Sequence, residues 1–168
     1  MSRAPQVGLV RWSLSAARRL VAGAPLTAGD AAAWHPAYPT PDTVAALALA
    51  LGACEAAGPL VRQPPWWVYG IRADGQVVGD IGFHGPPAAE GPVVVEIGYG
   101  VVPDQRGRGV ATRACTLLLE LAWRAGAETV LADTEPDNAP SRAVLGRNGF
   151  AVRADGCWEV HRPAGWAG

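Results

Sequence analysis

The sequence predicts an α/β (α+β) fold in which a mixed sheet of six or seven strands carries helices on both faces. Residues 66–102 contain three strand-like runs that suggest an antiparallel meander. A glycine-rich turn follows the third run and leads directly into a helix-like segment. A short apolar strand, a second helix and a pair of short strands then come in turn, so strands and helices alternate toward the C-terminus.

The N-terminal third is predicted to form a strand, a helix, a loop and a second helix. Residues 6–12 suit a short strand, and residues 16–22 a short helix begun by Ser13 or Ser15. Prolines and aromatic residues make residues 23–40 a loop whose apolar side chains should pack. The next helix should run from Thr40-Pro41-Asp42 through Ala57, because Thr40 can cap it and proline suits its first position. Its apolar stripe has helical spacing: Val44, Leu47, Leu51 and Cys54.

The meander begins at Trp66, where side chains alternate along the chain through Ile71. Asp74-Gly75 lies at the centre of a turn, which is a strong hairpin signal, and residues 76–83 return as a strand. Residues 93–102 form the third strand. Gly98 and Gly100 within it are consistent with a bulge or a close approach, although they could merely relieve crowding.

The C-terminal half continues with a helix-like run over residues 113–125. Together with the end of the preceding turn, it places apolar residues on one face: Val110, Ala114, Leu117, Leu118 and Leu121. Residues 129–134 suit a short strand. Residues 140–147 suit a helix that Asn148-Gly149 ends. Residues 150–153 and 157–162 are predicted to pair as a final hairpin.

Composition excludes several classes of protein. The chain has 168 residues, a net charge of −1 and a pI near 6.3, which suit one domain over residues 1–168 and argue against a nucleic-acid binder. No apolar run is long enough for a membrane helix, and no signal peptide is evident, so we expect a cytoplasmic protein. The three cysteines are far apart in sequence, and Cys115 should be a small core residue. No metal site is expected.

All fourteen basic residues are arginine. A P-loop requires lysine after its second glycine, and Schiff-base chemistry also requires lysine, so both classes are excluded.

The turn Pro103-Asp104-Gln105-Arg106-Gly107-Arg108-Gly109 joins the third meander strand to the following helix. The first N–H groups of a helix lack internal partners, and its N-terminus is electropositive, so such a turn suits an anion. Two arginines add mobile positive charge. The turn therefore predicts a site for a phosphate-bearing ligand.

A dinucleotide-binding fingerprint fits this turn poorly. It would require a third glycine where Thr112 stands, and it should follow the first strand of a βαβ unit rather than an antiparallel meander. Glu128 has nearly the spacing of the ribose-binding acid but precedes the next strand.

Three motifs together resemble the GCN5-related N-acetyltransferase (GNAT) family, closest to its ribosomal-protein-alanine acetyltransferase-like branch. Residues 106–111, Arg-Gly-Arg-Gly-Val-Ala, match the family's Q/R-x-x-G-x-G/A signature. Residues 96–101 look like its fourth strand, and residues 137–150 resemble the "DNxxSxxVLxxxGF" helix of that branch. The resemblance covers roughly residues 66–160.

The resemblance implies acetyl-CoA as acetyl donor, without a metal, and a sheet whose fourth and fifth strands splay apart. The backbone of the turn would hold the pyrophosphate, and the free edge of the fourth strand would pair with the pantetheine arm. Cofactor-binding residues would then be Tyr99, Val101, Arg106, Gly107, Arg108, Gly109, Val110, Ala111, Thr112, Asn138 and Ser141.

Acetyl transfer to an amine requires a base, an oxyanion donor and a proton for the departing thiolate. Glu96, within an apolar strand beside the cofactor groove, is the first candidate base, and Asp133 across the splay is the second. Each has a plainer reading: Glu96 could face solvent or pair with an arginine, and Asp133 could cap a loop. The resemblance implies the Val101 N–H as oxyanion donor. Many relatives carry a tyrosine where Leu145 stands, which leaves Ser141 as the available hydroxyl.

The acceptor side is expected in residues 1–65, and the core with the acetyl-CoA site in residues 66–162. His84, Trp34 and Trp66 are candidates for acceptor binding, although each could be structural instead. The predicted function is transfer of an acetyl group to a primary amine, either a protein α-amine or a small molecule, by direct attack in a ternary complex. The alternatives are a non-catalytic acyl-CoA sensor on the same fold and a Rossmann-type oxidoreductase. A homodimer is possible.

Overall fold

The computed structural model describes residues 3–27, 33–56 and 65–166. Within them, seven strands form one sheet in the order β1-β2-β3-β4-β5-β7-β6. The first four strands pair antiparallel, and the parallel β4–β5 pair makes the sheet mixed, as predicted. The strands are β1 (Val7–Arg11), β2 (Val68–Ala73), β3 (Gln76–Phe83), β4 (Val94–Val101), β5 (Thr129–Ala132), β6 (Ala151–Val152) and β7 (Trp158–His161).

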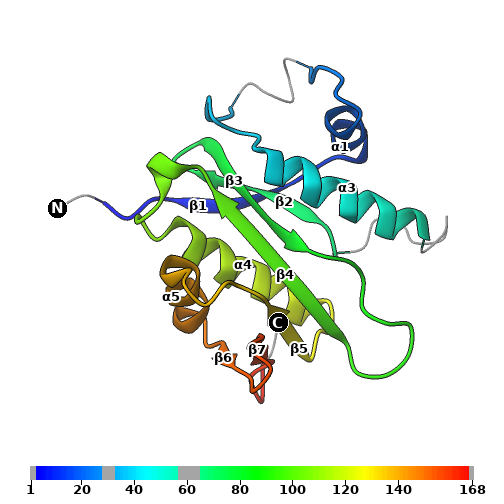
Figure 1. The fold of residues 1–168 in the computed structure, drawn as a ribbon, viewed down its shortest axis with the longest axis vertical. Helices are drawn as coiled ribbons and strands as arrows, with labels where there is room; N and C mark the ends of the chain where they lie inside the picture. Colours follow the sequence, from blue (N-terminus) through cyan, green and yellow to red (C-terminus); the bar gives the residue numbers. More distant parts are fainter. Residues whose placement is uncertain (1–2, 28–32, 57–64, 167–168) are drawn as a thin grey trace.

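In the described part of the chain, four helices cover the sheet on its two faces (Figure 1). Helices α1 (Leu14–Val21) and α3 (Pro41–Ala56) pack on each other and cover one face. Helix α4 (Val110–Arg124) crosses the opposite face, with α5 (Ala139–Arg147) beside it. A short 3₁₀ turn, η1 (Pro103–Gln105), joins β4 to α4. The predicted helices on both faces are therefore confirmed among the described residues.

Capping side chains explain where the helices begin. The Ser13 hydroxyl accepts a hydrogen bond from the Ala16 N–H, so Ser13 rather than Ser15 caps α1. The Thr40 hydroxyl accepts from the Thr43 N–H at the start of α3. The predicted end of α3, at Ala57, lies outside the described residues.

The core lies between the sheet and its helices. Ile71, Ile81 and Ile97 are fully or almost fully buried in the central strands, and Leu118 and Cys115 are fully buried in α4. The prediction that Cys115 is a core residue is confirmed. Helix α4 begins at Val110, three residues before the predicted Arg113, because Gly109 rather than Thr112 is its N-cap.

The predicted bulge at Gly98 and Gly100 is wrong, because the β3–β4 register is continuous from Phe83–Ile97 to Gly79–Val101. The register shift instead lies between β2 and β3, beside Ile71 and Arg72. The predicted close approach holds at Gly98 but not at Gly100, where an added Cβ would meet nothing within 4 Å. A Cβ on Gly98 would lie 2.7 Å from His84 Nε2, and a Cβ on Gly79 would overlap the Gly100 carbonyl oxygen.

The Gly79 contact predicts a loss of stability for Gly79→Ala. The added methyl would push backbone against backbone, and overpacking of this kind typically costs about 1–3 kcal/mol. We expect thermal unfolding to shift down by roughly 2–9 °C for a chain of this size. Gly8→Ala is the matched strand control, because its Cβ would meet nothing within 4 Å. Equal melting temperatures for the two variants would contradict the proposed contact.

Candidate functional site

The glycine turn places bare backbone at the start of α4. Gly107 and Gly109 have φ values of 72° and 80°, in the left-handed region that favours glycine. Gly109 is the N-cap and has no side chain with which to cap the helix. The first N–H groups of α4 therefore have neither intrahelical partners nor a side-chain cap. This is an electropositive cradle suited to phosphate oxygens.

The two arginines of the turn, which the sequence predicts to add positive charge, both have hydrogen-bond partners. Arg106 Nε donates to the Val101 carbonyl oxygen at 2.8 Å. Arg108 Nη2 lies 3.0 Å from Asp74 Oδ2 in the β2–β3 turn, and Arg108 also donates to Gln105. Both arginines are nevertheless exposed. They rim the cradle in defined positions and rigidify the turn.

Strand β4 has a free edge beyond the point where β5 ends. Its pairing with β5 runs from Val94–Thr129 to Ile97–Ala132 and stops, whereas β4 continues to Val101. The Val102 N–H donates to Val78 of β3, and N–H directions alternate along a strand. The N–H groups of Tyr99 and Val101 therefore point away from β3, toward the free edge. The predicted splay of β4 and β5 is confirmed by this register.

A pair of hydroxyls bridges the gap between β4 and α5. Tyr99 Oη lies 2.8 Å from Ser141 Oγ, and it donates to the Ser141 carbonyl oxygen at 3.2 Å. Burial raises the pKa of Tyr99 to about 12, so its hydroxyl stays protonated at neutral pH. Asn138 caps α5 by accepting from the Ser141 N–H at 3.2 Å. Sequence reasoning identified Tyr99 and Ser141 separately but not their contact.

Glu96 and His84 meet on the α3 side of the sheet. His84 Nδ1 lies 3.0 Å from Glu96 Oε1, and the side chains are 45% and 42% exposed. Glu96 is therefore half-buried, and its partner across the strands is a histidine, the first loop residue after β3, rather than an arginine. Gly98 leaves the space into which the His84 imidazole extends.

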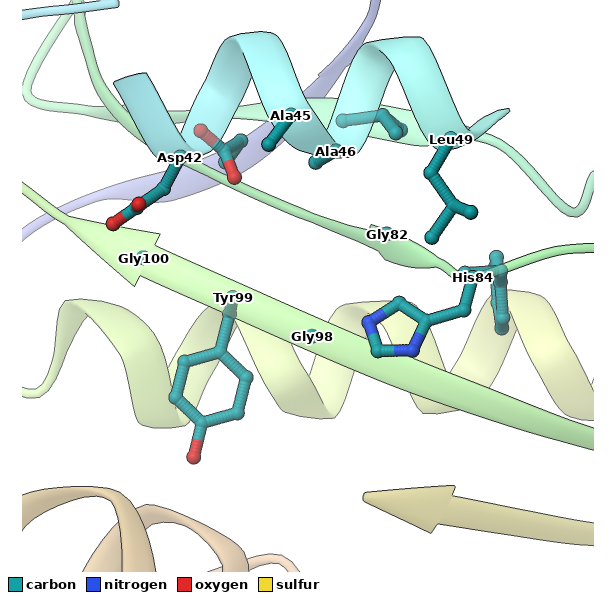
Figure 2. A pocket seen from close by; sticks show the side chains of 12 residues that line it. Asp42, Ala45, Ala46, Leu49, Gly82, His84, Gly98, Tyr99 and Gly100 are labelled. Carbon is teal, nitrogen blue, oxygen red and sulfur yellow. The ribbon is translucent and has the colours of Figure 1, made fainter. Parts of the chain in front are cut away.

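A pocket of about 290 Å³ lies between α3 and strands β3 and β4 (Figure 2). His84 and Leu49 lie toward one end, and Asp42 lies toward the other, near Gly100. The β4 residues of its wall are Gly98, Tyr99 and Gly100, the same residues that form the free edge. Strand β4 thus has a free edge and also forms one wall of the pocket. The other lining residues are Ala45, Ala46, Val68, Asp80, Gly82 and Phe83.

Sequence reasoning missed Asp80 and Asp42. Asp80 is only 7% exposed and accepts a hydrogen bond of 2.5 Å from the Thr43 hydroxyl. Burial raises its pKa to about 6, with the Thr43 hydrogen bond opposing the rise and the nearby Asp42 adding to it. A charged residue within the apolar strand Gln76–Phe83 was the available signal.

Three other predicted site residues lie apart from the pocket wall. Asp133 is exposed after β5 and accepts a hydrogen bond from the adjacent Thr134 N–H at 2.9 Å. Trp34 stacks with Trp12 and Tyr38, and Trp66 packs edge-on against Phe83. Leu145, which takes the place of the relatives' tyrosine, is fully buried.

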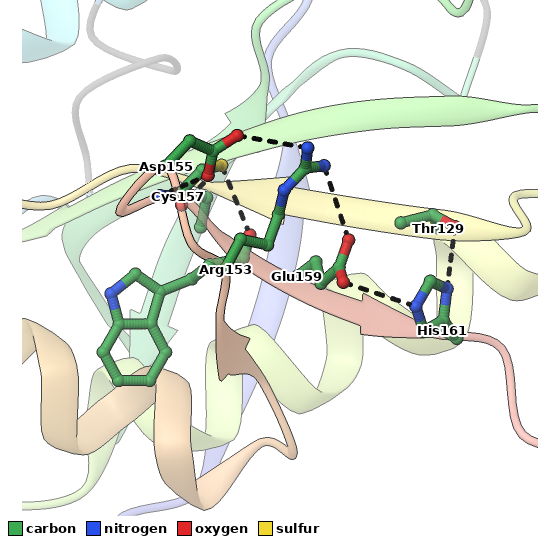
Figure 3. A network of polar contacts seen from close by, with 8 residues as sticks. Thr129, Arg153, Asp155, Cys157, Glu159 and His161 are labelled. Carbon is green, nitrogen blue, oxygen red and sulfur yellow. Dashed lines mark hydrogen bonds and ion pairs between the residues drawn. The ribbon is translucent and has the colours of Figure 1, made fainter.

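The β6–β7 hairpin is tied down beside the end of β5 (Figure 3). Arg153 pairs with Asp155 at 3.1 Å and Glu159 at 3.5 Å. The Cys157 thiol donates to the Ala132 carbonyl oxygen at 3.5 Å, at the last residue of β5. These contacts hold β5 where the splay begins.

The described residues contain no group of three or more His, Cys, Asp or Glu side chains placed to hold a metal ion. Within the same ranges, no helix has the length and apolar character needed to cross a bilayer.

Comparison with solved structures finds the same fold in several proteins. Mycobacterium smegmatis RimJ, solved in complex with CoA-disulfide, is 24% identical, with a TM-score of 0.61 over 92% of this chain and 81% of that one. Salmonella typhimurium yncA, solved with acetyl-CoA, is 22% identical, with a TM-score of 0.60 over 98% of both chains. The ribosomal-protein-S5-alanine acetyltransferase of Vibrio fischeri is 15% identical, with a TM-score of 0.59 over 100% and 98%.

Family membership rests on the sequence itself. No curated protein matches the chain at a significant level. The sequence profile described as the acetyltransferase (GNAT) domain, however, matches residues 7–151, which is most of the chain. The glycine cradle and the free β4 edge fit this assignment. The chain belongs to the GNAT family of acetyl-CoA-dependent N-acetyltransferases.

Proposed function

We propose that this enzyme transfers an acetyl group from acetyl-CoA to a primary amine by direct attack in a ternary complex, with the amine bound in the α3 pocket. The observation that carries the proposal is the double role of β4. The edge of β4 is unpaired at Tyr99 and Val101, where the CoA arm would bind, and Gly98 to Gly100 form one wall of the pocket. Donor and acceptor would therefore meet across a single strand.

The donor site is built from backbone and two arginines. The N–H groups of Val110, Ala111 and Thr112 at the start of α4 would bind the pyrophosphate, and Gly107 and Gly109 keep the approach open. Arg106 and Arg108 would contribute charge from the rim. The outward N–H and C=O groups of β4 would pair with the amide-bearing arm as an added strand does. Asn138 and Ser141 lie on the opposite side of the gap, at the start of α5.

Glu96 is proposed as the base, with His84 holding its carboxylate. A free alkyl amine has a pKa near ~10 and is mostly protonated at neutral pH, so it must lose a proton before attack. The neutral nitrogen then attacks the thioester carbonyl carbon and forms the C–N bond. The nitrogen gives up its second proton to solvent, the C–S bond breaks, and sulfur leaves as the thiolate. The Tyr99 N–H, which points to the free edge next to Gly98, would stabilise the oxyanion, and the Val101 N–H that the family resemblance implies points to the same edge two residues further on.

The Tyr99–Ser141 pair is proposed to return a proton to the thiolate. The two oxygens are 2.8 Å apart beside the free edge of β4, and the thiolate would lie next to this pair. Tyr99 is the better acid of the two hydroxyls, and Ser141 can relay its proton. This pair takes the place of the tyrosine that many relatives carry on α5, where this chain has the buried Leu145.

The N-terminal part of the chain, residues 1–65, is proposed to form the acceptor side. Helix α3 supplies Asp42, Ala45, Ala46 and Leu49 to the pocket, and α1 packs against α3. Residues 66–162 would carry the acetyl-CoA site.

The test is acetyl-CoA turnover, measured as thiol release, against a panel of small primary amines and peptides with free N-termini. We expect acceptor-dependent thiol release, an N-acetylated product by mass spectrometry, and intersecting initial-velocity plots typical of a ternary complex. Parallel plots would contradict direct attack. Tight CoA binding without thiol release for any amine would contradict the proposed acetylation of amines.

A further inference from the structure

The end of the pocket near Gly100 carries two carboxylates. Asp80 lies on β3 opposite Gly100, and Asp42 lies in the first turn of α3 (Figure 2). Both line the cavity. Within residues 3–27, 33–56 and 65–166, neither forms an ion pair with a basic side chain. A buried carboxylate without a cationic partner is costly, so this end of the pocket is electrostatically incomplete.

The structural role of Asp80 does not require its charge. Its Oδ2 accepts from the Thr43 hydroxyl, which ties α3 to β3, and a neutral oxygen could accept this hydrogen bond as well. Behind Thr43, the Tyr38 hydroxyl accepts from the Trp12 indole N–H at 3.2 Å. Burial, and to a lesser degree Asp80, raise the pKa of Tyr38 well above its usual value, so Tyr38 adds no charge. The negative charge of Asp80 is thus left to face the pocket.

The pocket has a polar group at each end and an apolar middle. His84, hydrogen-bonded to Glu96, lies at one end, and Asp42 and Asp80 lie at the other. Side chains of Ala45, Ala46 and Leu49 line the α3 wall between them. Along β4 the two ends correspond to Gly98 and Gly100, two residues or about 7 Å apart. A short aliphatic chain with a nitrogen at each end matches this layout.

We propose that the acceptor is an aliphatic diamine, with one amine attacked beside Gly98 and the other held as a cation by Asp80 and Asp42. This inference rests on the proposed function. The attacked nitrogen loses its proton to Glu96 and forms the new C–N bond as the C–S bond breaks. The second nitrogen stays protonated and bound to the carboxylates. The product is a monoacetylated diamine, and a cavity of about 290 Å³ has room for a molecule of this size.

The experiment compares 1,4-diaminobutane with n-butylamine, which has the same chain and a single amine. Assays at pH 8 keep Asp80 ionised, because the pKa of its carboxyl is about 6. We expect kcat/KM for the diamine to exceed that for the monoamine by roughly 10- to 100-fold, as one charge-assisted hydrogen bond supplies. The product should carry a single acetyl group.

Asp80→Asn should remove most of this preference, measured as the ratio of kcat/KM for the diamine to kcat/KM for butylamine within the variant. Asparagine retains an oxygen for the Thr43 hydroxyl, so the α3–β3 contact should survive. Asp42→Asn, at an exposed position, is the second variant and should reduce the preference without affecting folding. Glu55→Gln is the matched control, because it removes a carboxylate from the same helix outside the pocket.

Equal rates for the two amines in the wild-type enzyme would overturn the diamine assignment and leave the proposed amine acetylation intact. A loss in Asp80→Asn or Asp42→Asn that is the same for both amines would also overturn it. Failure of the proposed function would look different, because no amine of any kind would then support thiol release.

Discussion

Replacing Glu96 with glutamine is expected to lower kcat for an alkyl amine by roughly 10²- to 10⁴-fold, the usual contribution of a general base. Glutamine keeps an oxygen within reach of His84 but cannot accept the amine's proton. Binding of CoA should be unchanged, because Glu96 lies on the α3 side of β4 and not on the free edge. Steady-state thiol release and CoA titration measure the two effects separately.

The choice of acceptor shows whether Glu96 acts as a base or only positions the amine. A weakly basic amine is already neutral at pH 7 and needs no base. Glu96→Gln should therefore lower kcat far less with methoxyamine than with an alkyl amine. Equal losses with both would mean that Glu96 orients the acceptor. Glu90→Gln, in the exposed loop before β4, is the control for loss of a nearby negative charge.

Gly109→Asp is expected to abolish binding of CoA. The substitution places a carboxylate at the N-cap of α4, where the pyrophosphate would bind, and like charges repel there. In the wild-type enzyme, CoA at 100 times its Kd should stabilise the fold by about 2.7 kcal/mol, which raises the melting temperature by roughly 5–11 °C. Thermal unfolding with and without CoA measures the difference.

Gly109→Asn separates charge from conformation. Asparagine and aspartate have the same shape and adopt the left-handed region about equally well, so the strain at φ 80° is shared. Both are also good N-caps, so both variants should fold. Asparagine should retain part of the CoA-induced shift, whereas aspartate should show none. An unchanged shift in Gly109→Asp would show that the pyrophosphate site is elsewhere.

Most of the sheet could be predicted from local signals. Alternating side chains and the Asp74-Gly75 turn predict the meander, and its antiparallel pairing is confirmed. The glycine turn predicts a strand-to-helix junction, and Gly109 is indeed the N-cap of α4. These predictions succeed because turn geometry, helix capping and strand periodicity depend on residues a few positions apart.

The acceptor side could not be predicted in the same way. Asp80 is separated from Thr43 by 37 positions and from Gly100 by 20, yet it accepts a hydrogen bond from the first and lies opposite the second across two strands. Trp34 and Trp66 were candidates for acceptor binding because they are aromatic, but they pack against other aromatic rings. The face of the sheet to which a strand residue points depends on the strand register. The helix that covers that face depends on tertiary packing, which short-range sequence signals do not show.

By itself, the sequence determined the donor half of this enzyme. The family signature spans the turn at Gly107 and Gly109 and the start of the helix that follows. Because these residues are contiguous, their role in binding an anion can be predicted from the sequence alone. Only the tertiary structure decided three contacts: Glu96 with His84, Tyr99 with Ser141, and Asp80 with Thr43. Each joins residues far apart in the sequence, and only the pairing of β3 with β4 and the packing of α3 and α5 bring them within hydrogen-bond distance.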